Sequence, residues 1–448
     1  LPSFSIQFIM RFSTLLSSLA LVATSLAATD EQDTTSLQAS LQTTTSIKVA
    51  SGCSFRDTFT ATAQSDLDRI AGCEAVQGDI VITGDLGSAS IANVKAIYGD
   101  LQIFNATNLE FFAADAITTI TGSLKLHGLT VLSTLSFGSL NNVGAINWVT
   151  LPNLVETGLT QVTDCNSIYI SDTMLSDLNG INPSNVEIFN INNNFNLASI
   201  SSNIQTVSNA LSIGFNGDDT VVEFEDLVWA NNLTFYSVAS ISMPNLVAIN
   251  KSAGFFESSV QELNFPLVDL IGSDLTIENN NYLSYIDFSN VTAIGGGLVI
   301  VNNTDLTSID NVDKIKTVQG AVVLKGDFDN CTMSSLKTVR GAFDLETSGY
   351  ADCDPFKKLS KNGGIQGEFK CKAKSKPSSS TSKSSSTDSE SSTMTRDSTS
   401  TSSSDDDSNS SSATNTVSSI SSTSRGGAAS LKNTSIFGTM AAILLSLL

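Results

Sequence analysis

Two adjacent copies of one phrase decide the fold: SDLTIENNNYLSYIDFSNVTAIGG (273–296) and GLVIVNNTDLTSIDNVDKIKTVQG (297–320), with a third copy beginning at AVVLKGD (321–327). Each copy opens with a short apolar alternation, such as Leu275-Thr276-Ile277. An Asn-rich turn follows, then a Leu-x-x-Ile segment, and finally an Ile or Val ahead of the next Gly. The order of these parts is the same in both copies, which indicates a structural repeat.

This sequence repeat recurs through most of the chain. Its strand-opening positions step by 21 to 24 residues, apart from two steps of 43 and 42 that each span two periods, with blurred copies near 186–188 and near Phe255. The positions are Ile80, Leu101, Leu124, Ile146, Ile168, Leu211, Leu233, Leu275, Leu298, Val322 and Phe343. A fixed period near 22 is typical of a solenoid, in which each unit buries its apolar face only against its neighbours.

The sequence predicts an all-β fold, a parallel β-solenoid with one strand in register on every turn, here called a rung. Alternation places Leu275 and Ile277 on the inner face, and Leu-x-x-Ile segments such as 283–286 supply a second inward wall. Asn suits the turns because it tolerates left-handed backbone and can form ladders along the axis. The repeat lacks a long helical stripe, unlike horseshoe leucine-rich repeats. Thirteen rungs at ~4.8 Å spacing predict a stack roughly 60 Å long.

The two ends of the chain carry targeting signals. We expect translation to begin at Met10, because the segment from there has a basic residue at Arg11, an apolar core over 15–22 and small residues before Ala27. This pattern predicts a secretory signal peptide cleaved after Ala27. At the other end, small residues, a polar spacer and a thirteen-residue apolar tail (436–448) predict a GPI-attachment signal. The predicted attachment residue is Gly426, with Gly427 and Asn433 as weaker choices.

The segments between these signals differ sharply in composition. The Ser- and Thr-rich stretch before the tail cannot bury enough apolar area to fold, and it is typical of a disordered, O-glycosylated stalk. The predicted organisation is upstream residues and signal peptide (1–27), N-terminal lead and Cys cap (28–77), β-solenoid (78–345), C-terminal Cys cap (346–374), stalk (375–425) and GPI signal (426–448).

Disulfides are expected at both open ends of the solenoid, where apolar side chains and backbone need covering. Cys53 and Cys73 bracket a stretch that could hold a short helix, and we predict that they pair. At the other end Cys353 has two possible partners, Cys331 one repeat before it and Cys371 after it. Cys165 stands alone among the rungs, either with an unassigned partner or as a buried thiol.

Composition restricts the partners. The formal net charge is −21 and the isoelectric point is near 4.3, which excludes nucleic acid as an expected partner. The N-x-S/T acceptor sites for N-glycosylation predicted in the folded part are Asn105, Asn232, Asn250, Asn290, Asn302 and Asn330, with further sequons at Asn409 and Asn433. Turn positions such as Asn105 and Asn302 should face solvent, whereas Asn232 directly precedes a strand.

Little in the sequence suggests catalysis, and we predict no cofactor and no metal site. The single His127 follows a strand and is expected to be an exposed turn residue, so neither a zinc site nor a Ser-His-Asp triad can be assembled. Asp218, Glu223 and Glu225 are the acids that a glycosidase reading would use. Aromatic candidates for sugar binding are Trp148, Trp229, Phe235 and Tyr236, whereas Phe137 and Phe288 are expected in the core.

The order of modules resembles a known family. A signal peptide, a Cys-flanked start, Gly-polar-Leu-x-Ile rungs, a close of CDPFKKL (353–359) and GGIQGEFKC (363–371), a Ser/Thr stalk and a GPI tail follow one another. This is similar to the fungal GPI-anchored cell-wall-organisation proteins of the extracellular-mutant thirty-three type, which include sporulation-specific wall proteins. The resemblance implies a receptor L-domain-like, leucine-rich-repeat-related fold and a role in wall integrity, growth or spore-wall assembly, with no established catalytic residue.

Two functions remain open at this point. The first is a non-enzymatic glycoprotein of the extracellular surface, held at the outer leaflet by a GPI lipid or linked to the wall, that helps to organise the wall. Its partners would be cell wall polysaccharide, other wall proteins or further copies of itself. The second is a β-solenoid carbohydrate-active enzyme, or a polysaccharide-binding or adhesion receptor of the wall. An acid from the group above in a groove lined by Trp229 would favour the enzyme.

Overall fold

The computed structural model describes residues 46–217 and 219–375. The predicted signal peptide, stalk, GPI signal and the sequons at Asn409 and Asn433 lie outside the described residues, as does Asp218. Within the described part, no helix combines the length and apolar character needed to cross a membrane. Everything below concerns the folded part.

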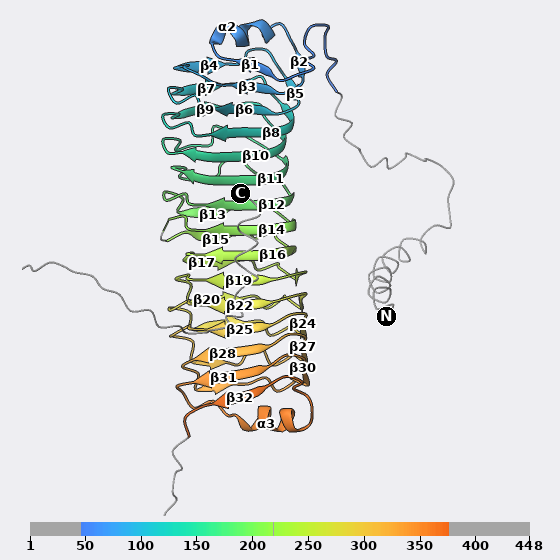
Figure 1. Ribbon diagram of the computed structural model, residues 1–448, viewed down its shortest axis with the longest axis vertical. Coiled ribbons are helices and arrows are strands. Elements are labelled where there is room, and N and C mark those ends of the chain that lie inside the picture. The colour runs from blue at the N-terminus through green and yellow to red at the C-terminus, as the bar shows by residue number, and fades with distance from the viewer. Residues whose placement is uncertain (1–45, 218, 376–448) are drawn as a thin grey trace, which may run out of the picture. The chain divides into compact units, whose positions relative to one another are not determined.

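The most regular rungs have three short strands that line three sides of one apolar core, and the chain climbs from one rung to the next (Figure 1). The rung that begins at Leu275 shows the pattern with β22 (Leu275–Glu278), β23 (Tyr285–Asp287) and β24 (Ala293–Ile294). We call the stacked sheets wall 1, wall 2 and wall 3 in that order. All strand pairs are parallel, so the predicted parallel β-solenoid is confirmed, with about 14 turns.

Wall 1 is continuous along the whole stack. Its own strands are β1 (Phe59–Ala61), β3 (Ile80–Ile82), β6 (Leu101–Phe104), β19 (Ala253–Phe256), β22, β25 (Leu298–Val301), β28 (Val322–Gly326), β31 (Phe343–Thr347) and β32 (Phe369–Lys372). Six longer strands run from wall 3 round into wall 1: β8 (Thr119–His127), β10 (Asn142–Leu151), β11 (Asp164–Thr173), β12 (Asn185–Asn192), β14 (Thr206–Gly214) and β16 (Trp229–Tyr236). Register shifts at 143/145, 186/188 and 207/210 let such strands bend between the two walls.

The other two walls are built from shorter strands. Wall 2 contains β4 (Ser88–Ser90), β7 (Phe111–Ala113), β9 (Thr134–Ser136), β13 (Ser199–Ser201), β15 (Val221–Glu223), β17 (Ser240–Ser242), β20 (Glu262–Asn264), β23, β26 (Ser308–Ile309) and β29 (Asn330–Cys331). Wall 3 contains β2 (Ala75–Gln77), β5 (Ala96–Tyr98), β18 (Ala248–Ile249), β21 (Leu270–Ile271), β24, β27 (Thr317–Val318) and β30 (Thr338–Val339), besides the first halves of the longer strands. The predicted strand of each rung is the wall 1 strand, and the regular rungs add strands on wall 2 and wall 3.

The wall 1 register confirms every predicted strand-opening position. Pairing runs unbroken through Phe59, Ile80, Leu101, Leu124, Ile146, Ile168, Phe189, Leu211, Leu233, Ala253, Leu275, Leu298, Val322, Phe343 and Phe369. Phe189 and Ala253 supply the two blurred rungs. The stack also reaches beyond 78–345, because residues 59–61 of the N-terminal cap segment and 369–372 of the C-terminal one themselves add strands to wall 1.

The core is a single column of apolar side chains. Leu283, Ile286, Leu306 and Ile309 are buried on wall 2, as the Leu-x-x-Ile pattern predicts. Phe137 and Phe288 are fully buried, also as expected. Rings from successive rungs stack inside the column, for example Phe265 against Phe288 with centroids 5.4 Å apart. Because each rung packs on its neighbours, the apolar column is continuous from one cap to the other.

The corner from wall 1 to wall 2 has the same backbone conformation on most rungs. From the rung of Ile80 to the rung of Leu298, the fourth residue after each strand-opening position has a positive φ, and we call this set the corner column. It comprises Gly84, Asn105, Gly128, Thr150, Asp172, Asn193, Phe215, Ser237, Glu257, Asn279 and Asn302. The predicted tolerance of Asn for left-handed backbone explains several of these positions.

The residue after the corner is often a buried Asn that ties two rungs together. The Nδ2 group of Asn280 donates to the carbonyl of Phe255 at 3.0 Å, and its backbone N–H donates to Oδ1 of Asn303 at 2.9 Å. Asn194 and Asn216 repeat the arrangement higher in the stack, with 3.1 Å from the Asn194 N–H to Asn216 Oδ1. The predicted Asn ladder is present, and its fully satisfied amides hold the corner shut.

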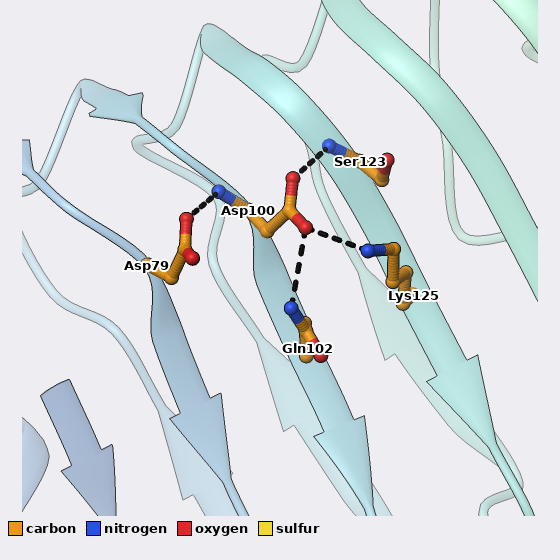
Figure 2. A network of polar contacts seen from close by, with 5 residues as sticks. All are labelled: Asp79, Asp100, Gln102, Ser123 and Lys125. Atoms are coloured by element: carbon orange, nitrogen blue, oxygen red, sulfur yellow. Dashed lines mark hydrogen bonds and ion pairs between the residues drawn. The ribbon is translucent and has the colours of Figure 1, made fainter. Parts of the chain in front are cut away.

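Carboxylates play the same part at the opposite corner, where wall 3 leads into wall 1 (Figure 2). Asp79 accepts the backbone N–H of Asp100 at 2.8 Å, and Asp100 accepts the N–H of Ser123 at 2.8 Å and Nζ of Lys125 at 2.6 Å. Burial alone would raise the pKa of Asp100, but the hydrogen bonds from Lys125 and Ser123 bring it below its ordinary value. These acids therefore have a structural role.

A disulfide closes each end. Cys53 is bonded to Cys73 around α2 (Gln64–Leu67) and the 3-10 turn η1 (Asp68–Ile70), within the stretch expected to hold a short helix. Cys353 is bonded to Cys371 around α3 (Asp354–Lys361), whose Phe356 ring packs on Phe343 with centroids 4.6 Å apart. Figure 1 shows the two helical caps at opposite ends of the stack.

The alternative pairing of Cys331 with Cys353 is wrong. One repeat of spacing does not bring the two residues together, because Cys331 lies inward on wall 2 in β29, whereas Cys353 has left the rungs to begin the cap helix. Cys331 and Cys165 are both free and buried. Burial raises the pKa of Cys165 to about 11 and that of Cys331 to about 12, so both are neutral thiols in the core.

Candidate functional site

Glu223 and Glu225, two of the acids that the glycosidase hypothesis would use, lie on an open surface. Glu223 ends β15 on wall 2 and Glu225 follows two residues later, with Phe224 buried between them, so both carboxylates face outward and are exposed. Oε1 of Glu225 accepts the Ser242 hydroxyl at 2.8 Å. Trp229 begins β16 on wall 3, so it does not share a surface with these acids. Among the described residues, Glu223 and Glu225 do not meet Trp229 in a groove of the kind that a glycosidase needs.

His127 is exposed, as expected, although it ends strand β8 and does not lie in the turn itself. It lines a shallow depression of about 360 Å³ on the outer face of wall 1 with Gln102, Lys125 and Asn147. Within residues 46–217 and 219–375, no three His, Cys, Asp or Glu side chains gather closely enough to hold a metal ion. The depression is open, is also lined by Ile103 and Phe104, and lacks the convergent groups of a catalytic centre.

Two of the four aromatic candidates for sugar binding are wrong. Trp148 and Phe235 are each 0% exposed, because alternation from Ile146 and from Leu233 turns both side chains into the core. Trp229 and Tyr236 are partly exposed. The register alone contained this information: a residue two positions after a strand-opening residue faces inward, and one three positions after it faces outward.

Tyr236 belongs to a row of aromatic side chains on the outer face of wall 1. Its ring stacks on Phe215 from the rung before, with centroids 5.2 Å apart and planes 20° from parallel, and on Phe256 from the rung after, at 4.7 Å and 17°. Phe215 is 46% exposed, and the other two rings are partly exposed. We call these three residues the aromatic strip.

Two glycines make room for the strip. A Cβ on Gly254 would overlap the Phe256 ring, and one on Gly214 would lie 2.9 Å from Cβ of Tyr236. Phe215 itself belongs to the corner column and has a φ of 55°. A bulky residue in this conformation is strained, so its presence where Asn stands on other rungs points to a role beyond folding.

Polar groups surround the strip. Asn192 and Ser212 lie on wall 1 near one end, and Glu257 and Glu278 lie near the other. Glu278 pairs with Phe256 in the wall 1 register and Glu257 follows Phe256 directly, so both acids lie at the Phe256 end of the strip. Burial raises the pKa of Tyr236, and the negative charges of Glu257 and Glu278 raise it further. The rim therefore offers hydroxyls, amides and carboxylates.

A second feature continues the strip round the corner. An open depression of about 420 Å³ is lined by Glu257, Ser258, Ser259, Asn279, Asn281 and Tyr282. Tyr282 is 63% exposed on the wall 2 side of this corner, and Phe195, near the other end of the strip, is 69% exposed. The sequence could have indicated the strip by aligning LSIGFNG (211–217), LTFYSVA (233–239) and AGFFESS (253–259) with LTIENNN (275–281), which places Phe215 in the corner position and Tyr236 and Phe256 in the outward position just before it.

The predicted glycosylation sites occupy different environments. Asn105, Asn250, Asn302 and Asn330 are exposed, whereas Asn232 and Asn290 are partly buried. Asn232 lies inside β16 rather than before a strand, and its Nδ2 donates to the Asn209 carbonyl at 3.0 Å. In the corner column, sequons occur at Asn105 and Asn302 and at none of the described positions between them, whereas the sequon at Asn232 lies on the same strand as Tyr236.

Comparison with known proteins defines the family. The chain is 40% identical to cell wall mannoprotein PST1 of Saccharomyces cerevisiae over 313 residues, which cover 69% of this chain and 70% of that protein. It is 35% identical to the cell surface GPI-anchored protein ECM33 of Candida albicans over 320 residues, covering 70% and 77%. It is 34% identical to protein ecm33 of Aspergillus fumigatus over 329 residues, covering 72% and 82%. The chain belongs to the ECM33/PST1 family of fungal cell wall proteins.

Membership in the ECM33/PST1 family confirms the resemblance drawn from the order of modules. It places the chain outside the cell, at the wall or the outer surface of the plasma membrane. None of the three relatives has a name that denotes an enzyme. No family model matches the chain, and no solved structure matches it. The relationship to receptor L-domains therefore stays a prediction, whereas the parallel solenoid itself is observed.

Proposed function

We propose that this protein is a non-enzymatic, GPI-anchored glycoprotein that contributes to the organisation and integrity of the fungal cell wall. The observation that carries the proposal is the match to PST1 and to the ecm33 proteins over about 70% of the chain, joined to a solenoid whose acids stand on open walls. A repetitive scaffold with large flat faces suits binding and spacing better than chemistry, which needs convergent groups in a shielded site.

The positions of Glu223 and Glu225 support a non-enzymatic function. Glu223 and Glu225 project from one face of wall 2 into solvent, with Phe224 buried between them. Hydrolysis of a glycosidic bond needs two carboxylates that face each other across the sugar, one of them kept protonated by its surroundings. Two exposed side chains on the same face do not meet that requirement.

The anchor is proposed from sequence. Gly426 is the proposed attachment residue, followed by a polar spacer and an apolar tail, and one relative is itself named a GPI-anchored surface protein. Phosphatidylinositol-specific phospholipase C should release the protein from isolated membranes of cells that express it. Retention after complete digestion of a control GPI protein would contradict the anchor.

The wall role is tested by deletion in the source organism. We expect the deletion strain to be hypersensitive to wall-binding dyes and the wild-type gene to restore resistance. A variant with Asp218→Asn, Glu223→Gln and Glu225→Gln should restore resistance equally, because these acids have no catalytic part. Normal dye resistance of the deletion strain would contradict the wall role. Failure of the triple variant, at normal surface level, would favour the enzyme reading.

A further inference from the structure

The outer face of wall 1 carries an aromatic surface that folding does not require. Phe215, Tyr236 and Phe256 stack outside the core, and the other members of the corner column are Asn, Asp, Glu, Thr, Ser or Gly. Exposed apolar patches rimmed by polar groups mark ligand or partner sites. From these observations we infer that the aromatic strip binds a neutral polysaccharide chain laid along the solenoid axis. This inference rests on the proposed wall function and deepens it by naming the ligand class.

The ring geometry fits the apolar face of a sugar. Phe215, Tyr236 and Phe256 form one stack of near-parallel rings with centroids 5.2 Å and 4.7 Å apart, and each ring keeps part of its surface exposed. The C–H groups of a pyranose ring pack against exposed aromatic surface, and the equatorial hydroxyls then point sideways. Phe195 and Tyr282 extend the exposed aromatic surface by one rung at each end. Five rungs at ~4.8 Å give a track on the order of 20 Å, long enough for several sugar units.

The polar residues around the aromatic strip can form hydrogen bonds with the hydroxyl groups of a sugar. Asn192 and Ser212 offer amide and hydroxyl groups beside Phe215 and Tyr236. At the far end Glu257 and Glu278 offer carboxylates, which accept hydrogen bonds from sugar hydroxyls and repel anions. With a formal net charge of −21, the protein as a whole also disfavours an anionic polymer. A neutral, hydroxyl-rich chain is therefore the ligand that matches both the rings and the rim.

The site is shaped before any ligand arrives. Gly214 and Gly254 leave the space that the Tyr236 and Phe256 side chains occupy, and the ladder below the corner, in which Asn280 donates to Phe255, fixes the backbone. In the corner column, Phe215 is separated by several rungs from the sequons at Asn105 and Asn302, so N-linked glycans at those two positions would attach away from it. Rigid aromatics on a fixed backbone lose little conformational freedom on binding.

The test uses the full protein released from the cell surface and two variants. Phe215→Asn with Tyr236→Ser replaces two rings by residues that other rungs carry at the corresponding positions, Asn193 and Ser171, so the fold should persist. Phe111→Ser, which removes a 41% exposed aromatic from wall 2, is the matched control. Soluble β-1,3-glucan and chitin oligosaccharides are titrated separately by calorimetry, and thermal unfolding checks each variant.

We expect the wild-type protein and the Phe111→Ser control to bind at least one of these glycans with equal affinity. The strip variant should lose about tenfold in affinity, which corresponds to about 1.4 kcal/mol of binding free energy. Binding that is equal in all three proteins, or absent from all three, would overturn the inference. So would self-association that depends on the strip, measured by sedimentation, without glycan binding, because it would assign the strip to a second copy.

Cells separate this inference from the proposed function. The strip variant, expressed at normal surface level in the deletion strain, should fail to restore dye resistance, whereas the Phe111→Ser control should restore it. Full rescue by the strip variant would overturn the inference and leave the wall role standing. Loss of rescue together with undiminished glycan binding would also overturn it, because a protein partner would then occupy the strip. A deletion strain without a wall phenotype would contradict the wall function itself.

Discussion

The corner at Asn279 and Asn302 and the corner at Phe215 have the same backbone and different surfaces. Both have φ between 55° and 60°, and both follow a wall 1 strand at the same offset. At Asn302 the side chain donates to Asn279 at 3.2 Å, so the residue serves the stack. At Phe215 the side chain leaves the stack and meets Tyr236. In a solenoid, stability is supplied by every rung, so a few rungs can carry residues chosen for another purpose.

The largest effect is expected from an inward position of the regular region. Leu298→Asp buries a charge without a partner in wall 1 and should destabilise the protein by more than about 4 kcal/mol, so that secretion is lost. Val299→Asp, on the same strand but facing outward, is the control and should be secreted normally. Immunoblotting of culture medium and cell extract measures both, and secretion of the Leu298 variant at wild-type level would refute the assigned register.

The Asn ladder should come next. Asn280→Ala removes the amide that donates to the Phe255 carbonyl and leaves that group buried and unpaired, so we expect a loss of about 1–3 kcal/mol in unfolding free energy. Asn281→Ala, at an exposed position one residue later, should change it by less than about 0.5 kcal/mol. Denaturant unfolding of the secreted protein compares the two. Equal effects would mean that the buried amides do not hold the corner.

A residue exchange between the two corners should have a smaller, unequal effect. Asn279→Phe loses the hydrogen bond from Asn302 and adds backbone strain, and it should destabilise the protein by about 1–2 kcal/mol. Phe215→Asn relieves strain but loses a ring stack, so it should change stability by less than about 1 kcal/mol. Thermal unfolding tests the pair. A larger loss from Phe215→Asn than from Asn279→Phe would make the strip a structural element.

The smallest effect is expected on the unfolding free energy at alkaline pH. Burial, with Glu257 and Glu278, raises the pKa of Tyr236 above its ordinary value of 10.0, so the folded protein holds this proton more tightly than the unfolded chain. The stability that this group contributes is complete below pH 10.0 and is lost as the pH rises through the folded pKa. Tyr236→Phe should reduce the decline in unfolding free energy above pH 10.0. An unchanged decline would contradict the placement of the carboxylates near the phenol.

Most of the fold could be predicted because the same apolar pattern occurs in many copies of the repeat. Leu275, Leu298 and Val322 fix a register that Ile80 and Phe343 continue, and alternation then assigns the inner face. Three strands a rung could not be seen, since wall 2 and wall 3 strands such as 308–309 and 317–318 are only two residues long. The Cys331 pairing failed because spacing by one period places residues on neighbouring rungs only while both remain in the stack.

The site was predicted less well than the fold. Tyr236 was recognised, but Phe215 and Phe256 were missed because a search for Trp and Tyr does not ask which face a ring occupies. Trp148 and Phe235 were misplaced for the same reason, although the register that buries them was already known. A surface formed by equivalent positions of successive rungs becomes visible only after the repeats are aligned and read down a column.

The disulfide between Cys353 and Cys371 has a mechanical consequence. A pull on the residues after Cys371 passes through the covalent bond to Cys353, so residues 354–370, which include α3, carry no load and cannot be extended while that bond is intact. Beyond it each rung is held only by its neighbours, so a sufficient force would release the rungs one at a time. Each released rung would add roughly 70 Å of contour length. The solenoid would then unfold in small steps under tension and would not unfold in one cooperative event.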